Sequence, residues 1–222
     1  KDSSQIESEL ELPVYATIAH SPIQKSGLKL LKKKKAPFLL AIKDSNDIAI
    51  ESLRSIRTAI HFALTQAKNN IIMISGPAPK VGKSFVSSNL AVIMAEKNKR
   101  VLVIDADLRR GHIHKYFDLN NQYGLTEYLN EQTTLKQMVQ NTKVPNLSVI
   151  TCGKSPANPS ELLNSARFYE LLQQLIPYYD HIIIDTAPVL AVTDAIIVSQ
   201  HAGINLVVAR YAETQMKELE LT

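Results

Sequence analysis

The stretch that decides the fold is "IIMISGPAPKVGKSF", which runs from Ile71 to Phe85. It starts as an apolar run typical of a buried strand, passes through a turn with Gly and Pro, and ends in GKS where a helical pattern begins. In that context, backbone amides and the start of a helix surround a polyphosphate. We therefore predict that the segment binds a nucleotide through Lys80, Val81, Gly82, Lys83, Ser84 and Phe85.

The spacing of this loop departs from the usual pattern. The motif GxxxxGK[ST] requires Gly at position 77, where the chain has Pro77, and Gly76 lies one residue early. The tripeptide GKS is therefore a weak signal by itself. In a phosphate-binding loop, Lys83 would reach the β and γ phosphates and Ser84 would offer its hydroxyl to Mg²⁺.

Two other apolar runs end in acidic residues. The run "RVLVIDADLRRG" carries Asp105 and Asp107, and "HIIIDTAP" carries Asp185. In an open parallel sheet, ligands bind beyond the carboxyl ends of the strands, so these side chains should meet the GKS loop at one edge. One Asp at a strand end is usually a cap or turn residue, but three beside GKS form a specific set. We predict a site for Mg²⁺ and a nucleoside triphosphate.

Strand-like and helical segments alternate along the chain. The apolar runs are "IIMISG", "RVLVIDAD", "LSVITCG", "HIIIDTAP" and "INLVVARYA". Helices are expected over residues 47–68, 83–97, 160–176 and 193–200. This alternation is typical of an α/β fold with a mostly parallel central sheet flanked by helices.

Residues 1–43, called the leader below, differ in charge from the rest. They hold eight Lys and four acidic residues, whereas residues 44–222 hold 17 basic and 17 acidic residues. The centre of the leader, "KLLKKKKAPF" (Lys29–Phe38), either meets anionic lipid at about 1 kcal/mol per lysine or is a solvated linker. We predict a basic, membrane-proximal linker over 1–43 and one globular domain over 44–222. No basic stripe continues into the domain, so nucleic acid is not an expected partner.

The composition points to a reducing compartment, because Cys152 is the single cysteine among 222 residues. The sequence contains no apolar run of about 20 residues and no signal-peptide pattern at its start, so a cytoplasmic location is expected. The chain starts without Met and ends at Thr222 inside a helical pattern. We expect a longer parent polypeptide and a missing C-terminal part of the domain.

The run "VLVIDADLRR" is where the chain resembles the bacterial tyrosine kinases, the Wzc-type cytoplasmic domains of polysaccharide co-polymerases. A Walker A motif ends in GKS, a Walker A′ motif spans Ile104–Asp107, and a Walker B motif spans Ile182–Pro188. The stretches "ESLRSIRT", "NPSELL" and "LAVTDA" add to the likeness. It extends from about Leu12 to the end of the chain.

The resemblance implies a P-loop NTPase fold like that of ParA and MinD (the SIMIBI type), with ATP or ADP and Mg²⁺ bound. It implies autophosphorylation on tyrosine between subunits of a homo-oligomeric ring, for which an octamer is one form, with the C-terminal tyrosine tail of a neighbour as substrate. It further implies control of capsular or exopolysaccharide chain length and export at the cytoplasmic side of the inner membrane. The implied partners are the polysaccharide export machinery and a cognate tyrosine phosphatase.

The resemblance also implies residue roles. Lys83 and Ser84 would hold phosphates and metal, while Asp107 and Asp185 would organise Mg²⁺ largely through its waters. Asp105 would orient or deprotonate the attacking phenol. A tyrosine hydroxyl has a pKa near 10 and loses its proton late in a loose transition state, so a carboxylate mainly positions the oxygen. Asp105 should therefore matter less than Lys83.

The stretch "ESLRSIR" fits the ExxRxxR ring-forming motif of that family through Glu51, Arg54 and Arg57. On a helix these residues span an arc of about 120° beside the apolar face, where two arginines could bind a neighbouring subunit. Without the family pattern, the simpler interpretation is a surface ion pair between residues three apart. The resemblance favours self-association.

The chain departs from the family in two places. His112 stands where related kinases often have a tyrosine, so a switch based on a phosphorylated tyrosine there is in doubt. The C-terminal tyrosine cluster, the usual phosphate acceptor, is absent, and the eight tyrosines are scattered. His112 and His114 are two residues apart with no other metal-ligating set nearby, so we expect surface residues and no metal pair.

Two alternatives remain. A ParA or MinD type of ATPase switch would share the phosphate loop, but its signature lysine falls at Ala78, and Lys80 is two positions too late. The other alternative is a scaffold that binds ATP to set ring assembly and catalyses little phosphorylation. It predicts nucleotide-dependent oligomers without phosphotyrosine.

Overall fold

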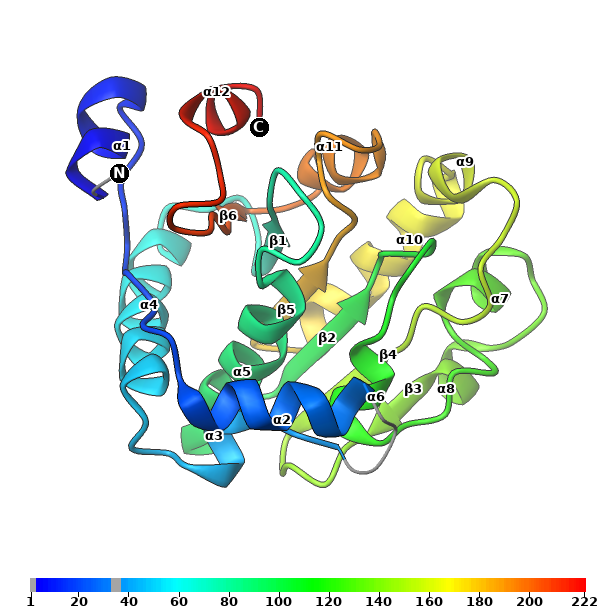
Figure 1. Cartoon of the computed structure of the whole chain (residues 1–222). Helices are drawn as coiled ribbons and strands as arrows, with labels where there is room; N and C mark the ends of the chain where they lie inside the picture. The colour runs from blue at the N-terminus through cyan, green and yellow to red at the C-terminus, as the bar shows by residue number, and fades with distance from the viewer. Residues whose placement is uncertain (1–2, 33–36) are drawn as a thin grey trace.

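The structure is a computed structural model that describes residues 3–32 and 37–222. The described residues form a six-stranded sheet with helices on both faces (Figure 1). The strands are β1 (Ile71–Ser75), β2 (Val101–Asp105), β3 (Val139–Asn141), β4 (Leu147–Ile150), β5 (His181–Asp185) and β6 (Ile204–Val207). Their order across the sheet is β3-β4-β2-β5-β1-β6. All neighbours pair in parallel except β3, which runs antiparallel to β4. The predicted mostly parallel α/β fold is confirmed.

The helices begin in the leader and continue to the end of the chain. The α-helices are α1 (Ser3–Leu10), α2 (Pro22–Lys32), α3 (Leu40–Lys43), α4 (Ile48–Leu64), α5 (Lys83–Ala95), α6 (Ile113–Phe117), α7 (Leu125–Leu129), α8 (Leu135–Met138), α9 (Pro159–Leu163), α10 (Ala166–Leu175), α11 (Asp194–Ser199) and α12 (Met216–Glu220). Two short 3₁₀ helices are η1 (Glu96–Asn98) and η2 (Ile176–Tyr178). In Figure 1, α1 and α12 both lie at the top of the view, α1 above α4 and α12 above β6.

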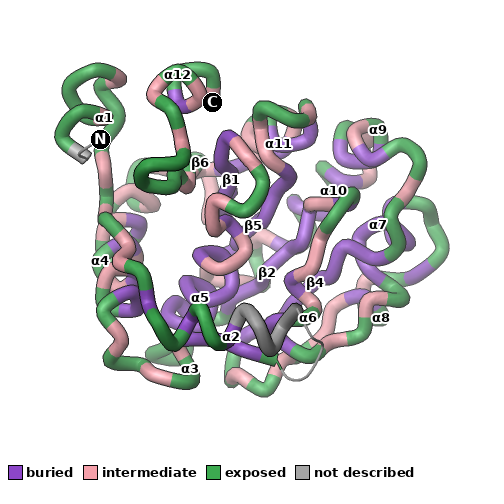
Figure 2. Tube along the Cα trace, in the orientation of Figure 1, coloured by how far each residue is buried: buried purple, intermediate pink, exposed green. Residues whose placement is uncertain are grey.

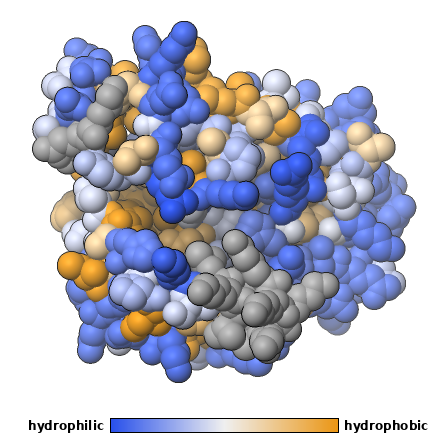
Figure 3. Space-filling view, in the orientation of Figure 1, coloured by the Kyte–Doolittle hydropathy of each residue, from blue (hydrophilic) through white to orange (hydrophobic). Residues whose placement is uncertain are grey.

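Alternate strand residues enter two separate hydrophobic cores, because successive side chains of a strand point to opposite faces. In β1, Ile72 and Ile74 pack with α3, α4, α5 and α6, whereas Ile71 and Met73 pack with the helices from α7 to α11. Figure 2 shows this buried centre enclosed by exposed outer helices. On the face drawn in Figure 3, the surface over α7, α8 and α9 is mostly hydrophilic, and most hydrophobic atoms lie over the other half.

The positions of the predicted elements are close to those observed, with two differences. The helix expected over 160–176 is two helices: the first ends at Leu163, and Ser165 caps the second by accepting a hydrogen bond from the Phe168 N–H at 3.2 Å. The helix expected over 83–97 ends at Ala95 and continues as η1, in which Lys97 has a left-handed φ of 57°. The three-residue strand β3 was not predicted.

Helix α4 forms where its apolar periodicity predicted. Asp47 caps it, since its carboxylate accepts a hydrogen bond from the Ala49 N–H at 2.8 Å. Ala49, Leu53, Ile56 and Ile60 are buried, together with Ile50. This face packs against α5, the helix that follows the GKS loop. The core therefore fixes the helix that carries Lys83.

Part of the leader lies inside the core. Phe38, Leu39 and Leu40 are buried with α4 and α5, and the backbone N–H of Ala41 donates to Asn89 Oδ1 on α5 at 2.9 Å. The segment next to residue 43 is thus packed against the domain and is not a free connector. The proposed division at 43 and 44 stays a prediction.

Residues 33–36, in the lysine-rich centre of the leader, lie outside the described residues. The expectation that this run touches lipid therefore concerns residues without a structural description. Within the described ranges, no helix combines the length and apolar character that crossing a bilayer requires.

Candidate nucleotide and magnesium site

The predicted site residues meet at the carboxyl ends of three neighbouring strands. In the register of the sheet, Asp105 at the end of β2 pairs with Asp185 at the end of β5, and Asp185 pairs in turn with Ile74 of β1. The loop after β1 leads to Lys83 and Ser84 at the start of α5. The strand ends that carry the predicted site residues therefore lie side by side, as the sequence predicted.

Gly82 sets the entry into α5. It has a φ of 118°, a left-handed conformation that L-residues with a side chain rarely adopt. The next residue, Lys83, already belongs to the helix, and it is almost completely buried with 7% of its surface exposed. Its Nζ donates to the carbonyl of Ala78 in the same loop at 3.3 Å. The loop therefore curls around the lysine side chain.

Both carboxylate oxygens of Asp185 accept hydrogen bonds from α5. Ser84 Oγ donates to Oδ2 and Ser87 Oγ donates to Oδ1, each at 2.7 Å. Ser87 lies one helical turn after Lys83 and also contacts its carbonyl at 3.0 Å. The sequence analysis missed Ser87, although its position four residues after Lys83 places it on the same face of the helix.

Asp105 is completely buried. Its Oδ2 accepts a hydrogen bond from the Ile113 N–H at 3.0 Å, whereas its Oδ1 has no partner among the described residues. Gly111 leaves the space for this carboxylate, because a Cβ there would lie 2.6 Å from both oxygens. A buried carboxylate oxygen without a partner is costly, so its presence indicates a place for a cation or a donor group.

The charges of the site act on one another. Burial lowers the pKa of Lys83, while Asp185 and Asp107 raise it. Burial raises the pKa of Asp185, against the hydrogen bonds from Ser87 and Ser84 and the charge of Lys83. Burial also raises the pKa of Asp105 well above its usual range, and Asp185 raises it further. The charges of Asp185 and Asp107 therefore act on Lys83, and an added cation would favour the ionised carboxylates.

The donor set fits Mg²⁺ held together with phosphates. Hydroxyl and carboxylate oxygens are the ligands that Mg²⁺ prefers, and this ion usually binds through one or two carboxylates plus substrate phosphates. Across residues 3–32 and 37–222, no three His, Cys, Asp or Glu side chains gather into a metal-binding group. The orphaned Asp105 Oδ1, the Ser84 hydroxyl and the loop around Lys83 together suit a magnesium–nucleotide complex.

Known proteins with similar sequences are tyrosine kinases. The tyrosine-protein kinase ptk of Acinetobacter johnsonii is 67% identical over all 222 residues, which correspond to 30% of that protein. The tyrosine-protein kinase wzc of Salmonella typhimurium is 44% identical over 99% of the chain, which corresponds to 31% of its length. A family model described as an AAA domain matches residues 69–220. The chain thus spans about 30% of the curated relatives that it matches.

Solved structures agree with these relatives. The kinase domain of the Escherichia coli tyrosine kinase ETK has a TM-score of 0.92 and 42% identity, covering 99% of this chain and 86% of that domain. The chain belongs to the bacterial tyrosine kinase family. The septum site-determining protein MinD of Pyrococcus horikoshii, solved with Mg-ADP, has a TM-score of 0.54 at 22% identity over 63% of this chain. That likeness shows a shared P-loop ATPase fold and nothing more.

In this bacterial tyrosine kinase chain, Asp107 lies beside the buried pair of aspartates in a tight turn. Its Oδ1 accepts a hydrogen bond from the Arg110 N–H at 2.9 Å, and its carbonyl accepts one from the Gly111 N–H at 2.6 Å. Asp107 is half-buried, unlike Asp105 and Asp185. It is therefore the acidic residue of the three that is most open to solvent.

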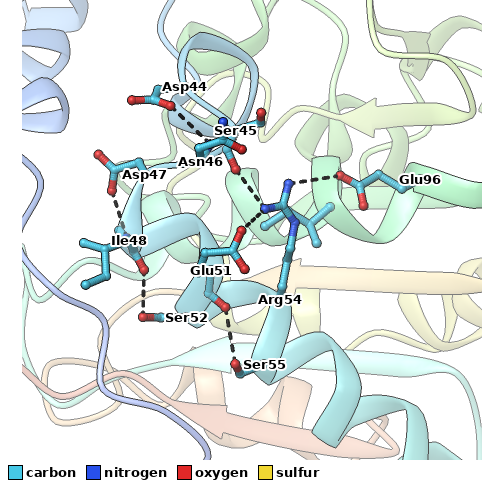
Figure 4. A network of polar contacts seen from close by, with 12 residues as sticks. Asp44, Ser45, Asn46, Asp47, Ile48, Glu51, Ser52, Arg54, Ser55 and Glu96 are labelled. Atoms are coloured by element: carbon cyan, nitrogen blue, oxygen red, sulfur yellow. Dashed lines mark hydrogen bonds and ion pairs between the residues drawn. The ribbon is translucent and has the colours of Figure 1, made fainter.

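The three residues of the ExxRxxR motif interact within the chain. Figure 4 shows Glu51 and Arg54 with their partners. Arg54 pairs with Glu51 and donates to the carbonyl of Ser45 at 2.8 Å. Arg57 pairs with Glu96 of η1 at 2.7 Å, and Arg54 reaches the same glutamate at 3.8 Å. The expected pair between residues three apart is present, and Glu96 is a partner that the sequence did not reveal. Both arginine side chains stay about a quarter exposed, at 26% and 28%.

His112 lies at the edge of the site. Its Nδ1 is 3.1 Å from the carbonyl of Arg110, and its ring stacks at a tilt on Tyr116. Its charge is one of the groups that lower the pKa of Asp185. An imidazole therefore lies near the acidic residues, at the position where related kinases often have a tyrosine.

Proposed function

We propose that this chain is the catalytic domain of a protein-tyrosine kinase that depends on ATP and Mg²⁺. The observation that carries the proposal is the convergence, at one edge of the sheet, of the loop and helix start that carry Lys83 with three aspartates, two of them buried. Membership of the bacterial tyrosine kinase family supports phosphate transfer to tyrosine. The geometry supports a polyphosphate and metal site without naming the acceptor.

We assign the groups of the site as follows. The backbone amides of residues 80–85 and the ammonium of Lys83 bind the β and γ phosphates. Ser84, Asp107 and Asp185 would hold Mg²⁺, the two carboxylates largely through its waters, and the ion would supply positive charge to offset that of the phosphates. The Ser84 hydroxyl donates a hydrogen bond to Asp185. This supports a direct contact of the hydroxyl with Mg²⁺ and an indirect contact of the Asp185 carboxylate.

Asp105 accepts the hydrogen bond of the attacking phenol and orients its oxygen. Its Oδ1 is free to do so, because Ile113 occupies only Oδ2. The raised pKa of Asp105 brings the carboxyl closer to the pKa of a phenol, but the phenol proton leaves late in a loose transition state. Orientation is therefore its main contribution.

The parent protein would extend well beyond this domain, because the chain spans about 30% of its curated relatives. We infer a protein anchored in the bacterial inner membrane with this domain on the cytoplasmic side. It would regulate capsular or exopolysaccharide chain length and export, together with the export machinery and a cognate tyrosine phosphatase. The substrate would be the C-terminal tyrosine tail of a neighbouring subunit.

The arrangement of subunits would be a ring held by α4. Glu51, Arg54 and Arg57 lie on one side of this helix, and both arginines keep part of their surface exposed. Two apolar side chains near the ends of the same helix, Ile48 and Phe62, are 65% and 68% exposed. Charged and apolar groups on one exposed helix support its use as a contact between copies of the domain.

The kinase proposal is tested by incubating the chain with labelled ATP, Mg²⁺ and a tyrosine-rich tail peptide. We expect label on tyrosine, and loss of it in Lys83→Met, since that lysine neutralises the phosphates. Lys99→Met is the matched control, because this exposed residue precedes β2 at the opposite edge of the sheet. Equal labelling by Lys83→Met, or ATP hydrolysis without phosphotyrosine, would contradict the proposal, and the latter result would favour an ATPase switch.

A further inference from the structure

Three side chains from separate parts of the sequence form one polar cluster beside the site. They are Arg109, just after the Walker A′ aspartates, Ser160 of "NPSELL" and Asp194 of "LAVTDA". Arg109 Nε donates to Asp194 Oδ2 at 2.9 Å, and Arg109 Nη2 donates to Oδ1 at 3.3 Å. Ser160 Oγ donates to Asp194 Oδ1 at 2.6 Å and accepts from Arg109 Nη2 at 3.1 Å. Each member thus contacts the other two.

Asp194 cannot be an ordinary surface acid, because it is completely buried as the first residue of α11. A buried carboxylate requires a cation or several donors, and the forked guanidinium of Arg109 supplies two donors in a fixed geometry. The Arg109 side chain is 39% exposed, so the arginine is the member of the pair that contacts solvent. Arg109 is therefore held by Asp194, and a lysine could not reproduce both contacts.

The cluster joins a turn and two helices that follow strands of the sheet. Arg109 belongs to the turn after β2, Ser160 to the helix after β4, and Asp194 to the helix after β5. The turn after β2 also contains Asp107, whose carboxylate and carbonyl are both bonded inside it. Arg109 is the residue through which this turn is bonded to α9 and α11.

We propose that Arg109 and Asp194, completed by Ser160, are positioning residues that fix the Asp107 carboxylate for Mg²⁺. This inference rests on the proposed function, which gives Asp107 its metal. The phosphate loop does not belong to the turn after β2, because residues 76–85 follow β1 and lead into α5. Loss of the Arg109–Asp194 pair should therefore lower the affinity for Mg²⁺ and leave the binding of metal-free nucleotide unchanged.

The test is a titration of the purified chain with a fluorescent ADP analogue, first in EDTA and then at increasing Mg²⁺. For Asp194→Asn we expect the nucleotide affinity in EDTA to stay within about twofold, and the Mg²⁺ concentration for half-maximal effect to rise by about tenfold. A tenfold change is the lower end of the usual effect of removing a residue that supports a metal ligand. Arg109→Lys should raise the Mg²⁺ requirement in the same direction.

Two further variants serve as controls. Asp180→Asn removes the carboxylate of another arginine pair, Arg100–Asp180, at the opposite edge of the sheet, and should leave the Mg²⁺ requirement unchanged. The double variant Arg109→Gln with Asp194→Asn should require no more Mg²⁺ than the stronger single variant, because the two residues act as one unit.

The inference is overturned by an unchanged Mg²⁺ requirement in Asp194→Asn, or by equal weakening of nucleotide binding with and without the metal. If Asp194→Asn gives no cooperative melting transition, Arg109→Lys decides by the same two criteria. The proposed function fails differently. Tight, Mg²⁺-dependent nucleotide binding by the unsubstituted chain without tyrosine phosphorylation would reject the kinase and keep the positioning pair.

Discussion

Asp105 and Asp185 are register partners on adjacent parallel strands, and each is the last residue of its strand. Both are buried, and burial raises the pKa of each. Two carboxylates held in this way repel each other when both are ionised, so their ionisation without a nearby cation carries an electrostatic cost. Lys83 and the two serines of α5 offset only part of it. A bound cation would relieve this repulsion. Without the cation, the repulsion lowers the stability of the folded protein.

That cost predicts a stabilising substitution. A carboxyl with a raised pKa in the folded state stabilises the protein fully below its unfolded pKa of about 4, and this contribution is lost as pH rises through the folded value. Asp105→Asn removes the ionisable group. We expect its melting temperature in EDTA to exceed that of the parent by a few degrees at pH 8, at about 2–4 °C per kcal/mol for a chain of this size.

The increase in melting temperature should shrink as the pH falls. It should vanish below about pH 4, where residue 105 is uncharged in both the parent chain and the variant. Asp118→Asn is the matched control, since Asp118 is exposed and paired only with an exposed lysine. A pH-independent gain in Asp105→Asn, or an equal gain in the control, would show that the buried charge is not the cause.

Two neighbouring serines of α5 provide a second prediction. Ser87 and Ser88 are both fully buried, but Ser87 donates to Asp185, whereas Ser88 Oγ has no hydrogen-bond partner among the described residues. Ser87→Ala should cost about 1–3 kcal/mol in the free energy of unfolding, because it leaves a carboxylate oxygen unsatisfied. Ser88→Ala should be neutral or stabilising.

Urea unfolding at pH 7 measures this difference, and fluorescent nucleotide binding with Mg²⁺ should weaken only in Ser87→Ala. Similar losses of stability in both variants would indicate that helix packing, rather than the bond to Asp185, explains the effect.

The leader gives a third prediction. A chain that begins at Asp44 lacks Phe38, Leu39 and Leu40, each of which contributes about 1.5–3 kcal/mol when buried. It also lacks the hydrogen bond from Ala41 to Asn89 on α5. Since a domain is stable by only about 5–15 kcal/mol, we expect this truncation to lose most of its stability.

A chain that begins at Pro13 is the comparison, because it removes residues 1–12, which include α1 and whose described side chains are mostly exposed. Its urea midpoint should match that of the whole chain. An unchanged midpoint for the chain beginning at Asp44 would place the domain boundary at 43 and 44, as the sequence predicted.

Self-association gives the fourth prediction. Arg54→Ala with Arg57→Ala should convert a ring into monomers, as measured by sedimentation velocity at fixed protein concentration. Glu96→Ala also removes the ion pairs that both arginines make with Glu96 and leaves the Arg54–Glu51 pair, but it should keep the ring, at a cost below about 1 kcal/mol. An arginine variant with unchanged mass would assign the motif to pairing inside one chain.

The strands and the main site residues were predictable because they depend on local patterns. The apolar runs from Ile71, Val101 and His181 are buried parallel strands, and a polar residue at the end of such a strand must lie at the ligand-binding edge. The meeting of Lys83 with Asp105 and Asp185 follows from that rule alone.

Other features depend on contacts between distant residues and leave no local signal. Glu96 meets Arg54 and Arg57 only because α5 and α4 pack side by side, and Arg109 meets Asp194 only because two loops converge. The short strand β3 forms against β4 without a clear alternating pattern of its own. The leader looked like a connector because its few apolar residues are separated by lysines, yet Leu40 is completely buried.

The register of β2 and β5 also limits how the length of this protein can vary. A strand rises by about 3.3 Å per residue and reverses its facing side at each step. One residue inserted between Val101 and Asp105 would therefore shift a carboxylate by that distance and turn it toward the other layer of helices. Insertions and deletions can be accommodated in the surface turns, whereas these two strands must keep their lengths for the acidic pair to form.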